Sequence, residues 1–113
     1  LQMDGRSVFK WAIRTLSDSV NQVLDAASLP ADEIDLTIFH QANIRIIDAA
    51  ANDLGLPADK VFVNLDKYGN TSAASIPLAL AEAVEQRLVR PGQNLLISGF
   101  GAGLAWGAGV WRW

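Results

Sequence analysis

The chain has 113 residues, half of them hydrophobic, which suffices for one domain with a buried core and argues against a disordered tail. A net charge of -3 without a run of like charge makes nucleic acid or an anionic membrane an unexpected partner. Cysteine is absent and only one histidine occurs, so disulfides and thiolate metal sites are excluded and we expect no metal site.

No apolar run approaches the roughly 20 residues that a membrane-spanning helix needs, and the first residues lack the features of a signal peptide. We therefore expect a cytosolic protein that binds small molecules or other proteins. Because the chain opens on Leu1 and not on methionine, we also expect it to be an excerpt of a longer protein.

The first half of the chain predicts a helix, a strand and a second helix. Apolar residues recur every three or four positions up to about Ala27, the period of an amphipathic helix. Pro30 cannot continue that helix, and the apolar run 34–39 is typical of a buried strand. The second helix should be capped at Ala42 or Asn43 and end at Gly55.

The second half predicts a strand, a helix and two further strands. Residues 61–65 are rich in β-branched and aromatic side chains, and a helix follows over 71–87, where Pro77 favours a regular start near Ser75. Strands over 94–98 and 104–113 are separated by so few residues that they should pair antiparallel. The glycine-rich run between them predicts a tight turn and is not a phosphate loop, because no lysine follows it.

Two polar side chains stand at the ends of predicted strands. His40 follows the run 34–39, and Asn70 follows Gly69 in the loop behind the next strand. Ligand sites of α/β sheets lie at the carboxyl ends of strands. A neutral imidazole and an amide are uncharged donors suited to stabilising an oxyanion or enolate. A lone histidine or a Gly-Asn turn is more often structural, so the interpretation depends on the joint context.

Three segments at matching spacings carry a family resemblance. They are His-Gln-Ala-Asn-Ile-Arg at 40–45, Gly-Asn-Thr-Ser-Ala-Ala-Ser-Ile-Pro at 69–77 and Gly-Phe-Gly-Ala-Gly-Leu-Ala-Trp-Gly at 99–107. Together they resemble the C-terminal half of a β-ketoacyl-acyl carrier protein synthase III, of the thiolase superfamily, in order along the whole chain. The resemblance implies an α/β fold in which a mixed sheet has helices on both faces, ends in an antiparallel strand pair and lacks its opening strand.

The resemblance also implies a reaction. Such an enzyme condenses an acyl-CoA starter with malonyl-acyl carrier protein, with loss of carbon dioxide, to start fatty acid synthesis, and it holds no permanent cofactor. Its nucleophilic cysteine lies in an N-terminal half that this sequence lacks. We therefore expect residues 1–113 to be one domain, the C-terminal portion of an acyltransferase that is inactive alone, and the complete protein to be a homodimer.

The resemblance assigns roles residue by residue. His40 and Asn70 would be the catalytic pair that holds the thioester oxygen, and the backbone N-H of Ala102 would serve the oxyanion hole, although many relatives have glycine there. The candidate contacts to coenzyme A or the pocket wall are Met3, Phe9 and Phe100.

The same resemblance places acyl carrier protein against the start of the second helix, on Gln41, Ala42, Asn43, Ile44 and Arg45. Arg45 suits an acidic carrier or its phosphopantetheine phosphate, and a solvated arginine at a helix start is an equally good interpretation. Asn52 and Asp53 stand where lysines are expected, which makes Lys10 another candidate for carrier docking.

Two alternatives remain open at this point. A related polyketide starter synthase would use the same histidine and asparagine, whereas Asn70 argues against the elongating synthases, which carry a second histidine there. The chain could also belong to a non-catalytic scaffold subunit of the same fold. A cysteine at a strand-to-helix turn upstream would favour the enzymes, and serine or glycine there would favour the scaffold.

Overall fold

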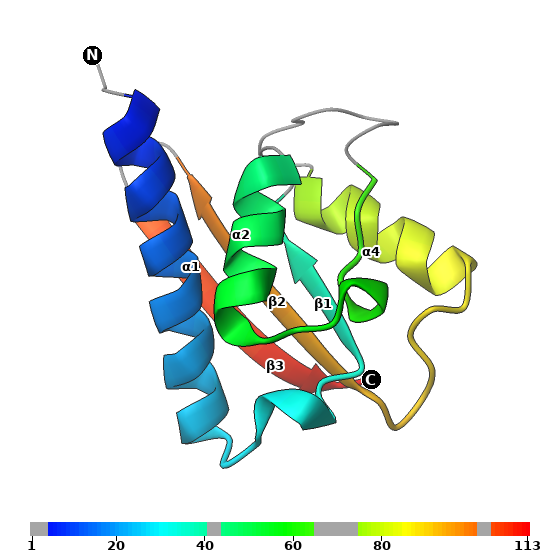
Figure 1. The fold of residues 1–113 in the computed structure, drawn as a ribbon. Helices are drawn as coiled ribbons and strands as arrows, with labels where there is room; N and C mark the ends of the chain where they lie inside the picture. Colours follow the sequence, from blue (N-terminus) through cyan, green and yellow to red (C-terminus); the bar gives the residue numbers. More distant parts are fainter. Residues whose placement is uncertain (1–4, 41–43, 65–74, 102–104) are drawn as a thin grey trace.

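A computed structural model of the chain describes residues 5–40, 44–64, 75–101 and 105–113. In these ranges the main elements are three α-helices around a three-stranded sheet (Figure 1). The helices are α1 (Gly5–Ala26), α2 (Ile44–Leu54) and α4 (Ser75–Glu85), and the strands are β1 (Leu36–Phe39), β2 (Asn94–Gly101) and β3 (Ala105–Arg112). The sheet order is β1-β2-β3, with β1 parallel to β2 and β2 antiparallel to β3.

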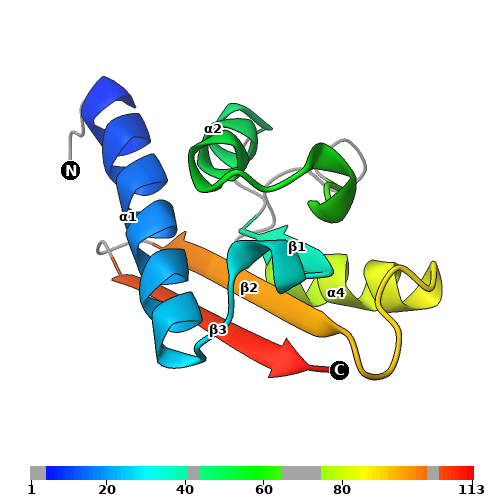
Figure 2. The same cartoon turned by 60° about the horizontal axis from the view of Figure 1, so that its bottom comes forward.

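The sheet lies between two helical layers, with α1 and α2 on one face and α4 on the other (Figure 2). Alternate residues of β1 serve the two layers: Leu36 and Ile38 pack in the cluster with α4, whereas Phe39 packs with α1 and α2. All four residues of β1 are buried, as a strand covered on both faces requires. The predicted mixed sheet with helices on both faces is therefore confirmed.

Each of the three helices ends with a residue in the left-handed region. These residues are Ser28, Gly55 and Arg87, and in each case the next N-H bonds back to the carbonyl five residues earlier. This pattern is the Schellman motif, which usually has glycine at the left-handed position. Gly55 confirms the predicted end of the second helix, but the other two positions carried no such signal.

Helix α4 begins at Ser75, the late start that Pro77 favoured. Proline is the third residue of the helix, where the N-H has no intrahelical partner to lose. Residues 71–74, where the predicted helix was to begin, lie outside the described ranges.

The predicted strand over 61–65 is wrong for the residues that the structure describes there. Val61 makes one isolated parallel bridge with Thr37, and the N-H of Phe62 donates to the Thr37 carbonyl over 2.9 Å. Residues 62–64 add no further ladder. Phe62 is nevertheless buried beside α4. Its apolar side chain therefore indicated burial in the core, and not pairing in a strand.

Apolar side chains remain exposed on α4, just after it and at the end of β3. They are Val84, Leu88, Trp111 and Trp113, each between 39% and 52% exposed. Beyond β3 the described sheet has no further strand, so that strand presents an unpaired edge. Within the described ranges, the chain taken alone therefore exposes both a sheet edge and apolar surface. Within the described ranges, no helix is both long and apolar enough to span a membrane.

Candidate active site

His40 lies directly after β1, at the carboxyl end of the parallel strand pair. Its backbone N-H donates to the Ser98 carbonyl over 2.9 Å, which continues the pairing of Phe39 with Ser98 by one residue. The residue itself is partly exposed, whereas Phe39 before it is fully buried. The backbone of the histidine is thus fixed by the sheet, and the residue as a whole is less buried than the strand before it.

Burial lowers the pKa of His40 from its ordinary value of 6.5, because desolvation penalises the charged imidazolium. At neutral pH the ring is therefore uncharged, with one nitrogen able to donate a hydrogen bond and the other able to accept one. An uncharged donor is suited to an oxygen on which negative charge develops.

The residue after Ser98 approaches the histidine closely. A Cβ atom added to Gly99 would lie 3.4 Å from the Cβ of His40 and 2.9 Å from the Cδ1 of Ile76 on α4. Positive φ angles occur at Gly55 and Gly92, and Gly99 is not among them. Gly99 is thus a point of close packing between β2, α4 and the residue after β1, and its φ angle places no demand for glycine.

On the opposite face of β2, the buried Ser98 side chain is tied to helix α1. The Ser19 hydroxyl donates to the Leu16 carbonyl over 3.0 Å, and the two serine hydroxyl oxygens lie 3.2 Å apart. Because the single proton of Ser19 is used on Leu16, the Ser98 hydroxyl must donate to Ser19. Sequence analysis missed this pair; its only signal was serine at positions of the buried face of the first helix.

Several other members of the predicted site lie outside the described part of the structure. For Phe100 the backbone pairs with Trp106 in the hairpin of β2 and β3, but its side chain is not described. The convergence of the histidine with the asparagine therefore stays a prediction. The residues outside the described ranges are Met3, Gln41, Ala42, Asn43, Asn70 and Ala102.

Arg45 and Phe9, which sequence analysis assigned to different ligands, lie together. The guanidinium carbon of Arg45 is 5.4 Å from the centroid of the Phe9 ring, within the range of a cation-π contact between α2 and α1. Arg45 is exposed, as is Ile44 before it. This contact orients the arginine at the start of α2, close along the chain to His40.

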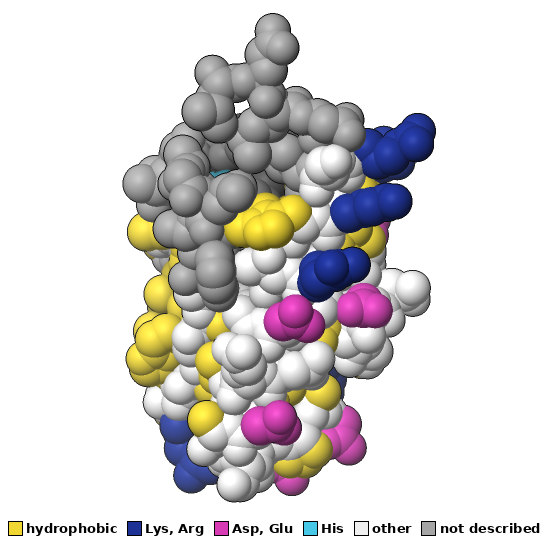
Figure 3. Space-filling model, turned by 90° about the vertical axis from the view of Figure 1, so that its left-hand side faces the viewer, with side chains coloured by type: hydrophobic (Ala, Val, Ile, Leu, Met, Phe, Trp, Pro, Cys, Tyr) yellow, Lys and Arg dark blue, Asp and Glu magenta, His cyan; other side chains and the backbone are white. Residues whose placement is uncertain are grey.

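Helix α1 carries further basic side chains near the same end. Arg6, Lys10 and Arg14 are spaced by four residues and are all exposed, so they form a row on one side of the helix. Figure 3 shows lysine and arginine side chains gathered on the upper part of this face of the molecule, with acidic side chains below them. The acidic Asp53, by contrast, lies at the far end of α2.

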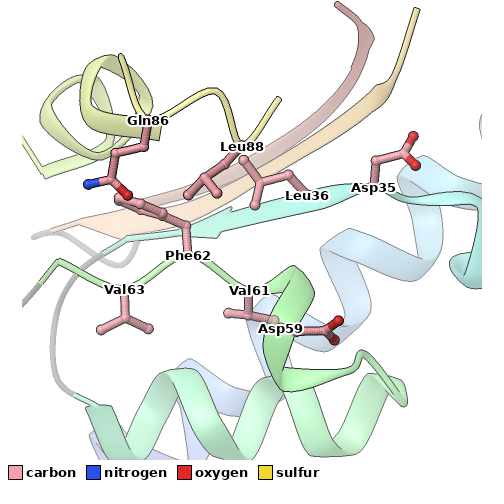
Figure 4. Close-up of a pocket in the computed structure, with 8 residues that line it drawn as sticks. All are labelled: Asp35, Leu36, Asp59, Val61, Phe62, Val63, Gln86 and Leu88. Carbon is pink, nitrogen blue, oxygen red and sulfur yellow. The ribbon is translucent and has the colours of Figure 1, made fainter. Parts of the chain in front are cut away.

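A hollow in the described structure lies away from His40. It measures about 370 Å³ and lies beside the start of β1, at the opposite end of that strand (Figure 4). Phe62 points toward Leu88 and Gln86 across it. The Asp35 carboxylate at its rim accepts a hydrogen bond from the backbone N-H of Asn94 over 2.8 Å. This carboxylate therefore has a structural role in joining the starts of β1 and β2. No group of three metal-binding side chains occurs among the residues that the structure describes.

Comparison with known proteins decides the family. The family model for the C-terminal domain of 3-oxoacyl-[acyl-carrier-protein] synthase III matches residues 24–113. The chain belongs to this family. The resemblance in the three sequence motifs is therefore confirmed.

The relatives agree along the whole chain. A β-ketoacyl-[acyl-carrier-protein] synthase III of Rhodopirellula baltica is 58% identical over 113 residues, which are 100% of this chain and 33% of that protein. The chloroplastic synthase III of Arabidopsis thaliana is 51% identical over 100% of this chain and 28% of its own length. The chain thus spans about a third of the length of these synthase III relatives.

A solved structure confirms the fold. The 3-oxoacyl-[acyl-carrier-protein] synthase III of Aquifex aeolicus superposes with a TM-score of 0.96 at 48% identity, covering 99% of this chain and 36% of that one. The described helices and mixed sheet thus match the C-terminal half of a synthase III, as the resemblance implied.

The depressed pKa of His40 can be measured directly, because it is the only histidine of the 113 residues. We expect its ring protons to titrate in an NMR experiment with a pKa below 6.5 in the folded chain. Burial disfavours the charged ring, so the proton binds only at lower pH than in the unfolded chain. Folding stability should accordingly fall as the pH drops below 6.5, and less so in His40→Gln. A folded-state pKa at or above 6.5 would contradict the conclusion that burial keeps the His40 ring uncharged.

Proposed function

We propose that this chain is the C-terminal part of a β-ketoacyl-acyl carrier protein synthase III that condenses an acyl-CoA starter with malonyl-acyl carrier protein and so starts fatty acid synthesis. The observation that carries the proposal is the family match over most of the chain, with a histidine of lowered pKa at the carboxyl end of β1. The substrates are acyl-CoA and malonyl-acyl carrier protein, with no permanent cofactor.

His40 acts when the malonyl group loses carbon dioxide. The electron pair of the breaking carbon-carbon bond moves into an enolate, and negative charge develops on the thioester oxygen. The neutral imidazole donates an N-H to that oxygen, and the Asn70 amide is its partner in this role. Uncharged donors held in place before the reaction stabilise such charge without a cost of reorganisation. The sheet supplies that rigidity through the backbone of His40.

The enolate carbon then attacks the acyl group on the enzyme cysteine. A carbon-carbon bond forms, the carbonyl oxygen becomes an oxyanion, and collapse expels the cysteine thiolate and leaves a β-ketoacyl product on the carrier protein. The backbone N-H of Ala102 donates to that oxyanion. Phe100 lines the pocket, and Met3 and Phe9 contact the coenzyme A arm.

The rest of the protein is expected to supply what this domain lacks. The N-terminal half would bring the nucleophilic cysteine and cover the exposed apolar surface of α4 and β3, and the complete enzyme would be a cytosolic homodimer. The chain alone should form no product, since it contains no cysteine. Product from the purified 113-residue chain would contradict this division of labour.

In the complete protein, His40→Ala or Asn70→Ala should slow decarboxylation of malonyl-acyl carrier protein about 10²-fold or more, the size expected for one oxyanion donor. The measurement is release of carbon dioxide under steady-state conditions.

Transfer of the acyl group from coenzyme A to the cysteine serves as the control, and Asn70→Ala should affect it less than decarboxylation. Unchanged condensation in Asn70→Ala would show that the amide does not hold the thioester oxygen. Unchanged decarboxylation in His40→Ala would remove the basis of the proposed function.

In this proposal carrier protein docks at the start of α2, on residues 41–45. Arg45 is exposed and oriented by Phe9, and Lys10 stands in the basic row of α1. Because acyl carrier proteins are acidic, these positive side chains would attract the carrier and steer its arm toward His40. The departure at Asn52 and Asp53 then matters less, since the basic residues of α1 take the place of the expected lysines.

Arg45→Glu should raise KM for malonyl-acyl carrier protein about tenfold, which corresponds to losing one charged contact. The same variant should leave kcat and KM for acyl-CoA close to those of the unmodified enzyme. Arg90→Glu, an exposed charge reversal in the loop that follows α4, is the matched control. Equal effects of the two variants would argue against docking at the start of α2.

A further inference from the structure

We propose that Phe9 is a positioning residue for Arg45 that determines how tightly the enzyme binds its acidic carrier protein, and not how tightly it binds acyl-CoA. The inference rests on the proposed function, because it concerns the arginine at which the carrier docks. It gives Phe9 a role that acts through a second side chain, beyond the contact with the coenzyme A arm that the resemblance implied.

The ring and the guanidinium come from two helices, α1 and α2, that begin at the same end of the sheet (Figure 1). Phe9 is partly buried and packs against the core cluster that α1 and α2 share, so the core supports the ring. The guanidinium carbon of Arg45 lies 5.4 Å from the centroid of that ring, although the arginine itself is exposed. A supported ring thus holds the charged end of a long, flexible side chain at the surface.

An aromatic ring holds a cation without neutralising it. The attraction comes from the quadrupole of the ring, so the guanidinium keeps its full charge, and the N-H donors at its edge stay available for an anion. In the part of the chain that the structure describes, Arg45 has this contact and no ion pair with a carboxylate. A carboxylate in place of the ring would compete with the carrier protein for the same arginine. The ring therefore orients the side chain and leaves its charge for a partner.

The stability of α2 does not explain a cation at this position. Arg45 is the second residue of the helix, at the positive end of the helix macrodipole. A positive side chain is favoured at the opposite end of a helix, near the unpaired carbonyl groups. The charge of Arg45 is therefore better explained by an anion that approaches from outside the chain.

Positioning the arginine beforehand should strengthen carrier binding by a modest factor. Ordering a flexible side chain reduces affinity, and a side chain that is already held avoids part of that cost. We therefore expect Phe9→Leu to raise KM for malonyl-acyl carrier protein about threefold, the size of an exposed cation-π contact, while kcat stays unchanged. Leucine keeps an apolar contact with the coenzyme A arm, so KM for acyl-CoA should stay close to that of the unmodified enzyme.

The test uses the complete protein and a double-mutant cycle of Phe9→Leu and Arg45→Ala. If the ring acts through the arginine, Phe9→Leu raises KM for the carrier substrate only while Arg45 is present, and the double variant equals Arg45→Ala. Phe9→Tyr keeps the aromatic face and should behave like the unmodified enzyme. Trp11→Leu is the matched control, because it removes another ring of α1 that packs against the same cluster. It should leave KM for the carrier substrate unchanged.

A fluorinated ring separates the cation-π contact from packing. Replacing Phe9 by a trifluorinated phenylalanine nearly keeps the shape of the side chain, but fluorine withdraws electron density from the face of the ring and weakens its attraction for a cation. This replacement should raise KM for the carrier substrate about as much as Phe9→Leu does. Because the packing is kept, the fluorinated protein decides the question even if Phe9→Leu does not fold. An unchanged KM would overturn the inference.

Failure of this inference can be told apart from failure of the proposed function. If Arg45→Ala raises KM for the carrier substrate but Phe9→Leu does not, the carrier docks as proposed and the ring does not position the arginine. Equal effects of Phe9→Leu with and without Arg45, or an equal rise in KM for acyl-CoA, lead to the same conclusion. If Arg45→Ala leaves KM unchanged, docking at the start of α2 is wrong, and this inference with it. If His40→Ala retains activity, the proposed function itself fails.

Discussion

The hydrogen bond from the His40 N-H to the Ser98 carbonyl is the constraint on which the candidate site depends. It ends the parallel pairing of β1 with β2 and so decides where the chain leaves the core. Strand β1 has only four residues, all buried, and is held by covering layers on both faces. A polar side chain placed directly after such a strand is rigid at its backbone and accessible at its tip.

Two adjacent residues of β2 connect this point to the two helical layers. Ser98 points toward α1, where its hydroxyl donates to Ser19, while Gly99 faces α4 and admits Ile76. Because successive residues of a strand face opposite sides, this dipeptide contacts both helical layers. The strand that holds the backbone of His40 is therefore packed against helices on both faces of the sheet.

Charge is arranged around the site in a complementary way. Burial keeps the histidine neutral, as its proposed role as a hydrogen-bond donor requires. The neighbouring surface is basic, with Arg45 stacked on Phe9 and the row on α1, although the chain as a whole has a net charge of -3. An uncharged reactive group beneath a positive rim suits an anionic substrate delivered by an acidic partner.

The sequence by itself determined the elements whose signals are local: the period of α1, the glycine that ends α2, the late start of α4 at Pro77 and the final hairpin. It also placed His40 at a strand end. Only the tertiary structure decided that Val61 makes a single bridge, that Ser28 and Arg87 adopt left-handed conformations, that Arg45 stacks on Phe9 and that Gly99 lies close to Ile76 and His40. The physical reason is that periodicity and turn chemistry report which side of an element is buried, whereas pairing and close approach depend on distances between segments far apart in the chain.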